Sequence, residues 1–115
     1  MAHRRELVKG NIDSLLLCLI GQRPTYGYQI IKELERRSQG YFRFKEGTLY
    51  PALHRLERAG LVHGSWQSLP SGQQRKYYRI TDKGRESLAE KTRQWQSFLA
   101  AMNCIIQPAV ALKRS

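Results

Sequence analysis

The side chains of this sequence that are best suited to chemistry are hydrogen-bond donors and cations between positions 45 and 58. If this segment is a helix, these side chains lie on the face opposite Leu49, Leu53 and Leu56 or next to that face. Hydroxyl, imidazole and guanidinium groups in this arrangement can reach the base edges and phosphates of duplex DNA. The candidate residues are Lys45, Thr48, Tyr50, His54, Arg55 and Arg58.

Two kinds of contact are expected from this segment. Lys45 and Thr48 stand at its start, where unpaired backbone amides and the helix dipole favour a phosphate. Arg55 has the geometry for a contact with guanine. The alternative is that Arg55 and Arg58 lie on a solvated face and pair with Glu57 or another carboxylate, as surface arginines commonly do. The pattern favours the DNA contact.

A second pair of cations, Arg75 and Lys76, opens an aromatic and β-branched run that ends at Ile80. A similar run covers 61–68, and the six residues 69–74 between the two runs predict a turn. The sequence therefore predicts a two-stranded hairpin that projects Arg75 and Lys76 from its tip toward phosphates or a minor groove. Alternatively, the two charges only protect an exposed strand edge.

The aromatic residues of this hairpin are expected to pack against protein. Side chains alternate across a strand, so one of Tyr77 and Tyr78 should face the core and the other should face outward. Trp66 on the paired strand is expected to contribute to the core or to the packing of the hairpin. Two strands offer too small a platform for stacking RNA bases, which argues against an RNA-binding protein.

The composition indicates a polyanionic partner. The 115 residues include 20 Lys and Arg against 9 Asp and Glu, a formal net charge of +11. Because neutralised phosphates release condensed counterions, this surplus favours nucleic acid. No apolar run approaches the roughly 20 residues of a membrane-spanning helix, and the first residues do not resemble a secretion signal. We expect a cytoplasmic protein without a membrane partner.

The sequence lacks the patterns that would indicate an enzyme. It has no nucleophile beside a histidine, no glycine loop for phosphates and no close acidic pair in a plausible cleft. Cys18 and Cys104 are far apart and the histidines do not cluster near them, so neither a metal nor a cofactor is expected. Both cysteines fall in apolar periodic stretches, which predicts buried thiols.

Helices must position the DNA-binding candidates. Apolar spacing predicts a first helix from Ile12, capped by Asn11 and ended by Gly21. The apolar pattern resumes at Tyr28 and predicts a second helix that stops before Gly40.

A third helix over 46–59 carries the candidate donors and ends at Gly60. A long amphipathic helix then follows the hairpin, beginning at the cap Thr81 and ending at about Gln107, because proline follows. Its apolar residues recur in a heptad pattern, and this seam predicts pairing with a second copy of the chain. The predicted dimer-interface residues are Leu88, Trp95, Phe98, Leu99, Met102 and Ile105.

The order of helix, helix, helix, hairpin and long helix predicts a mainly α (α+β) fold, a winged helix-turn-helix with a two-stranded wing and a long C-terminal dimerisation helix. The third helix of such a fold enters the major groove of duplex DNA. The expected division is a DNA-binding domain over 1–80, a dimerisation helix over 81–107 and a frayed tail over 108–115.

Several segments closely resemble the PadR family of bacterial repressors. They are 26–30 (YGYQI), 46–57 (EGTLYPALHRLE), 60–62 (GLV), 75–81 (RKYYRIT) and Gly84. The resemblance covers roughly residues 10–100, and it implies a homodimer built through the last helix, which represses transcription from a pseudo-palindromic operator. The short C-terminus resembles the compact form of the family, which has a single C-terminal helix.

Some compact members bind flat aromatic drugs at the dimer interface, and Trp95 lies where those members carry a stacking tryptophan. The resemblance thus allows release from DNA by a small aromatic effector, although a tryptophan there also suits plain dimer packing. Two other functions stay open. A nonspecific architectural DNA binder would show little operator preference, and a winged-helix protein-interaction module would present a more apolar and less charged surface.

Overall fold

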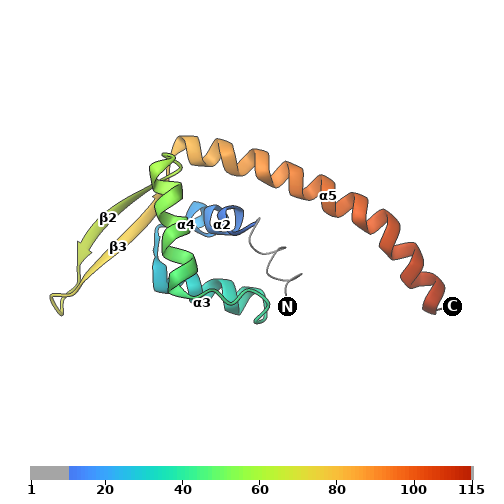
Figure 1. The fold of residues 1–115 in the computed structure, drawn as a ribbon, viewed down its shortest axis with the longest axis horizontal. Coiled ribbons are helices and arrows are strands. Elements are labelled where there is room, and N and C mark those ends of the chain that lie inside the picture. The colour runs from blue at the N-terminus through green and yellow to red at the C-terminus, as the bar shows by residue number, and fades with distance from the viewer. Residues whose placement is uncertain (1–10, 115) are drawn as a thin grey trace.

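The computed structural model describes residues 11–114 of the chain, with side chains described for 11–107. Three helices and a small sheet form a body, from which a hairpin projects on one side and a long curved helix on the other (Figure 1). The elements in chain order are α2 (Ile12–Gln22), β1 (Thr25–Tyr26), α3 (Gly27–Arg37), α4 (Glu46–Arg58), β2 (Val62–Ser68), β3 (Gln74–Ile80) and α5 (Asp82–Arg114).

The core lies where α2, α3 and α4 meet. Its largest fully buried side chains are Leu16, Leu17, Ile20, Ile30, Leu49 and Leu53. The three predicted helices are confirmed, but the register of the second is corrected. Its buried stripe is Gly27, Ile30 and Leu34, and Tyr28 is 52% exposed. The pattern read from Tyr28 misses this because Gly27 occupies the first inward position.

Helix ends follow the predicted signals in part. Gly40 has φ +82° and donates its N–H to the carbonyl oxygen of Glu35, so it stops the helix as expected. Asn11 stands at the start of α2, without a side-chain capping hydrogen bond. Gly21 does not end α2, which continues to Gln22; it lies in the helix and faces Leu88 of α5 instead.

The sheet has three strands in the order β1, β3, β2, all antiparallel, so the predicted hairpin is confirmed and a third strand is added. Thr25 and Tyr26 of β1 pair with Tyr78 and Tyr77. A strand of two residues is too short to show an alternating pattern in the sequence, and β1 forms only because it pairs with β3, which is distant in the chain. The hairpin turn spans 69–73 rather than the six residues predicted.

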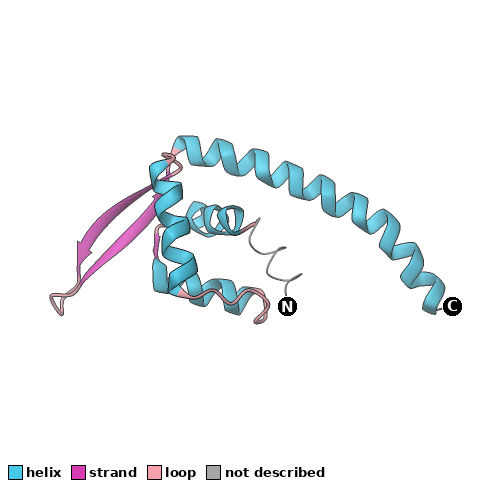
Figure 2. Ribbon diagram, in the orientation of Figure 1, coloured by secondary structure: helices cyan, strands magenta, loops and turns pink. Residues whose placement is uncertain are grey.

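Alternation along the hairpin is confirmed for Tyr78, which is buried, and Tyr77, which lies outward against Tyr26 with ring centroids 5.2 Å apart. The expectation that Trp66 packs is wrong, because its side chain is 65% exposed. Trp66 pairs with Lys76 in the outer half of the hairpin. That half extends past the helices, which therefore cannot cover it (Figure 2).

The start of α5 is fixed by Thr81, as its predicted cap. The Thr81 hydroxyl accepts a hydrogen bond from the Gly84 N–H (3.0 Å) and donates one to the carbonyl oxygen of Gly60 (2.6 Å). A Cβ on Gly84 would lie 2.0 Å from the carbonyl oxygen of Leu61, so this close approach admits only glycine. Thr81 and Gly84 thus fix the start of α5 against the base of the hairpin.

The predicted end of the last helix near Gln107 is wrong, because α5 continues to Arg114. Pro108 removes one amide donor, and the strong helix formers Ala109, Ala111 and Leu112 follow it and support continuation. The expected frayed tail is therefore helical up to Arg114. Residues 1–10, included in the predicted domain over 1–80, and Ser115 lie outside the described residues.

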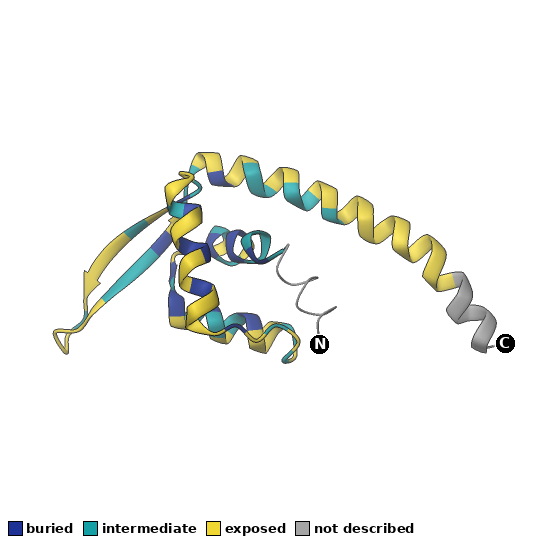
Figure 3. Ribbon diagram, viewed as in Figure 1, coloured by how far each residue is buried: buried dark blue, intermediate teal, exposed yellow. Residues whose placement is uncertain are grey.

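The predicted burial of Cys18 and Cys104 is also wrong, since both are exposed. Cys18 borders an open groove between α2 and α5, and Cys104 lies in the second half of α5. The described residues in that part of the helix are exposed, as Figure 3 shows. Over the described residues, no helix combines the length and hydropathy needed to cross a membrane. Nor do the described residues gather three or more His, Cys, Asp or Glu as a metal site requires.

Candidate nucleic-acid interface

Helix α4 presents one exposed stripe away from the core. Leu49, Ala52, Leu53 and Leu56 are buried, and the opposite side carries Gly47, Pro51, His54 and Arg58 at spacings of four, three and four residues. His54 and Arg58 are exposed, which places these two predicted donors at the centre of the outward face.

Arg55 lies on one flank of this stripe and already has a partner. Its Nη2 atom is 3.3 Å from Oδ1 of Asp13 on α2, and the two side chains are 58% and 40% exposed. The carboxylate that the sequence allowed for is therefore Asp13 and not Glu57. Because exposed ion pairs are weak, a base or phosphate could replace Asp13, and the guanine contact of Arg55 stays a prediction.

Tyr50 lies on the other flank, where α4 meets the first turn of α3. Its ring occupies the space beside Gly27, such that a Cβ on Gly27 would lie 2.6 Å from the Tyr50 hydroxyl oxygen. Tyr50 is still exposed on its remaining surface. The structure thus brings this predicted donor to the N-terminus of a second helix.

The starts of α3 and α4 both lack a side-chain capping hydrogen bond, at Tyr26 and Lys45 respectively. First-turn amides without such caps attract anions, and the helix dipole adds to the attraction. Lys45 and Thr48 are exposed beside the start of α4. Their predicted role as phosphate contacts is compatible with these positions.

The expectation that Arg75 and Lys76 project from the hairpin tip is wrong, since both are partly buried within β3. The Arg75 guanidinium lies over the Tyr26 ring, 4.3 Å from its centroid. Lys76 Nζ is 2.8 Å from Oε1 of Glu57 on α4. Strand alternation sends the two side chains to opposite faces of the hairpin, and each cation finds a partner on the neighbouring element.

Arg79 is an exposed wing cation that the sequence reasoning missed. It pairs with His63 across the strands and shares a face with Arg75. Strand alternation places Arg79 on the same face as Tyr77, but the sequence left open whether Tyr77 or Tyr78 faces outward, so alternation alone could not assign Arg79 to the outer face.

The ion pair of Glu57 and Lys76 shifts both titrations. The hydrogen bond from Lys76 is the largest cause that lowers the pKa of Glu57, and partial burial opposes it. The same bond raises the pKa of Lys76, again against burial. Both charges are therefore favoured by the folded structure.

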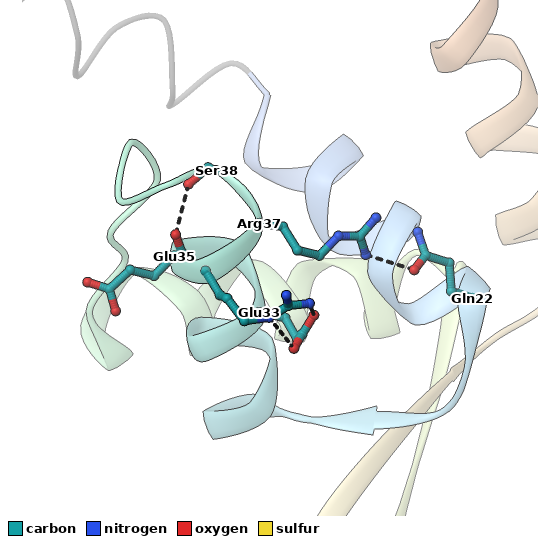
Figure 4. Close-up of polar contacts among 6 residues, drawn as sticks. Gln22, Glu33, Glu35, Arg37 and Ser38 are labelled. Atoms are coloured by element: carbon teal, nitrogen blue, oxygen red, sulfur yellow. Dashed lines mark hydrogen bonds and ion pairs between the residues drawn. The ribbon is translucent and has the colours of Figure 1, made fainter.

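A separate cluster of cations surrounds the far end of α3. Arg37 donates to the Gln22 side chain of α2 at 2.8 Å, and the Ser38 hydroxyl contacts the carbonyl oxygen of Glu35 (Figure 4). Arg36 forms an ion pair with Glu33 and is the largest cause that lowers the pKa of Glu33. Gln22, Glu33, Arg36 and Arg37 border a cleft of about 220 Å³. Because they join α3 to α2 at the end away from Tyr50, they support the fold rather than the outward face of α4.

Helix α5 carries an apolar strip that the body does not cover. Trp95 and Phe98 form an edge-to-face pair with centroids 5.6 Å apart. The large apolar side chains exposed beyond Trp95 are Phe98, Leu99, Met102, Ile105 and Ile106. Leu88, predicted at the dimer interface, packs against the core of its own chain.

A groove of about 570 Å³ runs between α2 and α5 and continues to the loop before α4. Leu15, Phe42 and Trp95 give it apolar walls, and Cys18 lies on its α2 side. The groove therefore joins the apolar strip of α5 to the connection that leads into α4.

Comparisons with known proteins agree with this geometry. Residues 16–90 match the family described as Transcriptional regulator PadR-like family. The transcriptional regulator Rv3488 of Mycobacterium tuberculosis is 36% identical over 89 residues, which cover 77% of this chain and 79% of that protein. Similar solved structures include a PadR family regulator from Eggerthella lenta (TM-score 0.78, 32% identity, 91% of this chain and 89% of that one).

A PadR-like regulator from Bacillus cereus gives a comparable match, with TM-score 0.78 and 32% identity over 89% of this chain and 97% of that one. The family match covers more than half of the chain, and these similarities extend from α2 into α5. The chain therefore belongs to the PadR-like family of transcriptional regulators, and its winged helix is a DNA-binding fold.

Proposed function

We propose that this protein is a cytoplasmic repressor that binds a pseudo-palindromic operator as a homodimer. The observation that carries the proposal is the uncovered apolar strip of α5, beginning at Phe98, on a chain with a formal net charge of +11. A strip of this kind is typical of an interface between subunits. A two-fold dimer would place two copies of α4 on successive major grooves.

Specific recognition of one operator also requires more base contacts than one copy of α4 can make. The exposed donors at the centre of α4 are His54 and Arg58, with Thr48 and Arg55 on one flank. One helix of this kind reads only a few base pairs, which is too little to select one site among the competing sites of a genome. Two copies double the contacts and fix the spacing of the half-sites.

Small aromatic molecules are the class of effector that the groove favours. Trp95 supplies a flat surface at its wall, and the Trp95–Phe98 pair shows that a ring is accommodated edge-on against it. The groove also reaches Phe42, three residues before Lys45 at the start of α4. We propose that a flat aromatic ligand bound there in the dimer shifts α4 and releases DNA.

The test of the repressor is fluorescence anisotropy with labelled duplexes from the region upstream of its own gene and with scrambled duplexes, at about 50 and 200 mM salt. Retained binding of an upstream duplex at the higher salt, with release of scrambled duplexes, supports a specific regulator. Equal loss on all duplexes, followed by no enrichment in selection from random duplexes, supports a nonspecific architectural binder. No binding at the lower salt supports a protein-interaction module.

The test of the effector uses the two tryptophans. In a Trp66→Phe variant, Trp95 is the remaining tryptophan, so quenching of its emission by planar aromatic compounds measures binding in the groove. Ligands that quench Trp95 should also release the operator duplex. Quenching without release would separate binding from regulation and count against the effector role.

A further inference from the structure

One carboxylate near the end of α4 holds both strands of the wing, which is the β2–β3 hairpin. Oε1 of Glu57 accepts a hydrogen bond from Nζ of Lys76 on β3 at 2.8 Å, and Oε2 accepts one from the backbone N–H of Gly64 on β2 at 3.2 Å. Both oxygens of Glu57 are therefore used, one for each strand.

The lack of a side chain at Gly64 makes this arrangement possible. A Cβ at this position would lie 2.4 Å from Cε of Lys76 and 2.9 Å from Oε2 of Glu57. The backbone of Gly64 is not in the left-handed region. Glycine is therefore needed at this position because of the limited space and not because of the backbone conformation. A residue with a side chain would push Glu57 away from the amide.

The pair is better protected than the other ion pair on α4. The side chains of Lys76 and Glu57 are 28% and 30% exposed, compared with 58% and 40% for Arg55 and Asp13. A protected pair with an additional hydrogen bond gives up its partner less readily than an exposed one. Lys76 also lies over the Tyr78 ring, 5.4 Å from its centroid, which further fixes its ammonium.

We propose that Glu57 sets the angle of the wing relative to α4. In this proposal Lys76 positions the wing through Glu57 and does not bind a DNA phosphate. This inference rests on the proposed function, in which α4 and the wing contact one duplex together. A wing held at one angle reaches the backbone beside the groove that α4 enters, without an entropic cost for ordering the wing on binding. The outer half of the wing, which carries Trp66, is the part whose position depends most on this contact.

The two roles of Lys76 predict opposite effects of Glu57→Gln on operator affinity. If Glu57 positions the wing, E57Q weakens operator binding by about three- to tenfold, K76M weakens it similarly, and the double variant is no worse than either. If Lys76 is a phosphate ligand, E57Q removes a competing charge and strengthens binding, whereas K76M weakens it. Tighter or unchanged binding by E57Q would therefore overturn the proposal.

Salt dependence gives a second readout that a merely structural role does not move. Removing a phosphate ligand lowers the slope of log affinity against log salt by about 0.9 for each phosphate that the protein no longer neutralises. We expect K76M to keep the wild-type slope. A reduced slope would identify Lys76 as a phosphate ligand and overturn the proposal. Glu86→Gln on α5 removes one exposed negative charge away from the wing and serves as the matched control for E57Q.

The contact can also be tested without DNA. Thermal unfolding first establishes that the variants are folded, and the exchange protection of the Gly64 amide is then compared by NMR. We expect E57Q and K76M to lose this protection, and E86Q to keep it. If the wild-type protein does not bind DNA specifically, the proposed function fails. If E57Q retains the protection of the Gly64 amide, the proposed role of Glu57 fails, whatever the result with DNA.

Discussion

Arg55 of α4 and Asp13 of α2, which are 42 positions apart, form an ion pair on the outside of the DNA-binding domain. The pair holds the guanidinium on the flank of the helix face that carries His54 and Arg58. DNA would have to compete with Asp13 for Arg55, and this competition can be measured.

Replacing Arg55 with alanine should weaken binding to the specific operator by about 1–3 kcal/mol and leave the fold intact, because it would remove the proposed bidentate pairing with guanine. Asp13→Asn should instead strengthen binding or leave it unchanged, since it frees the guanidinium. Anisotropy titrations with operator and scrambled duplexes measure both effects. If D13N weakens operator binding as much as R55A, the pair supports the structure and does not compete with DNA.

Replacing Phe98 with aspartate should break the proposed dimer and operator binding together, because Phe98 is 53% exposed on the apolar strip of α5, and the new charge would be buried in the subunit interface. Trp95→Asp should do the same, although Trp95 is partly buried in its own chain and its loss also affects folding. Ser97→Asp is the control, since helical spacing places Ser97 on the opposite side of α5. Sedimentation equilibrium measures the association. An F98D protein that remains dimeric would show that the subunit interface lies elsewhere.

Replacing Gly84 with alanine should destabilise the protein by about 2–4 kcal/mol, because the new Cβ would lie 2.0 Å from the carbonyl oxygen of Leu61 and must displace backbone. Gly47→Ala is the matched control, since a Cβ there meets no atom within 4 Å. Helix propensity predicts that G47A stabilises α4 by up to about 1 kcal/mol. Urea unfolding measures both changes. Equal stability of the two variants would mean that α5 can shift away from Leu61 at little cost.

The sequence predicted those features that depend on local spacing. The helix that carries His54 and Arg58 follows from the positions of its leucines, and the cap at Thr81 follows from residue type. That Tyr77 and Tyr78 face opposite sides of the hairpin follows from strand alternation, which does not say which of the two faces outward. These features require no knowledge of a distant partner.

The features that sequence reasoning missed depend on residues that are brought together only by folding. Arg75 and Lys76 were expected at a free tip, but Tyr26 and Glu57 hold them, and Glu57 is 19 positions away from Lys76. Trp66 was expected to pack, but its side chain is 65% exposed in the half of the hairpin that extends past the described helices (Figure 2). A charge or an aromatic ring looks the same in the sequence whether or not the fold supplies its partner.

The stability supplied by Glu57 should depend on pH in the acid range. Since the folded structure lowers the pKa of Glu57, chiefly through the hydrogen bond from Lys76, this stabilisation is complete above the ordinary glutamate pKa of about 4.3. It is lost as the pH falls through the lowered folded value. The free energy of unfolding of the wild type should therefore exceed that of E57Q at neutral pH, and the difference should shrink below about pH 4.3.

The folded structure also lowers the pKa values of Glu33 and Glu90, but these groups remain in both proteins. The difference in unfolding free energy between wild type and E57Q therefore isolates the effect of Glu57. On the alkaline side, the raised pKa of Lys76 keeps its contribution constant up to the ordinary lysine range and removes it only above that range. Urea unfolding of wild type, E57Q and K76M between about pH 3 and pH 7 measures the differences. A gap between wild type and E57Q that stays constant down to pH 3 would mean that the carboxylate charge contributes nothing and that the Gly64 hydrogen bond alone holds the wing.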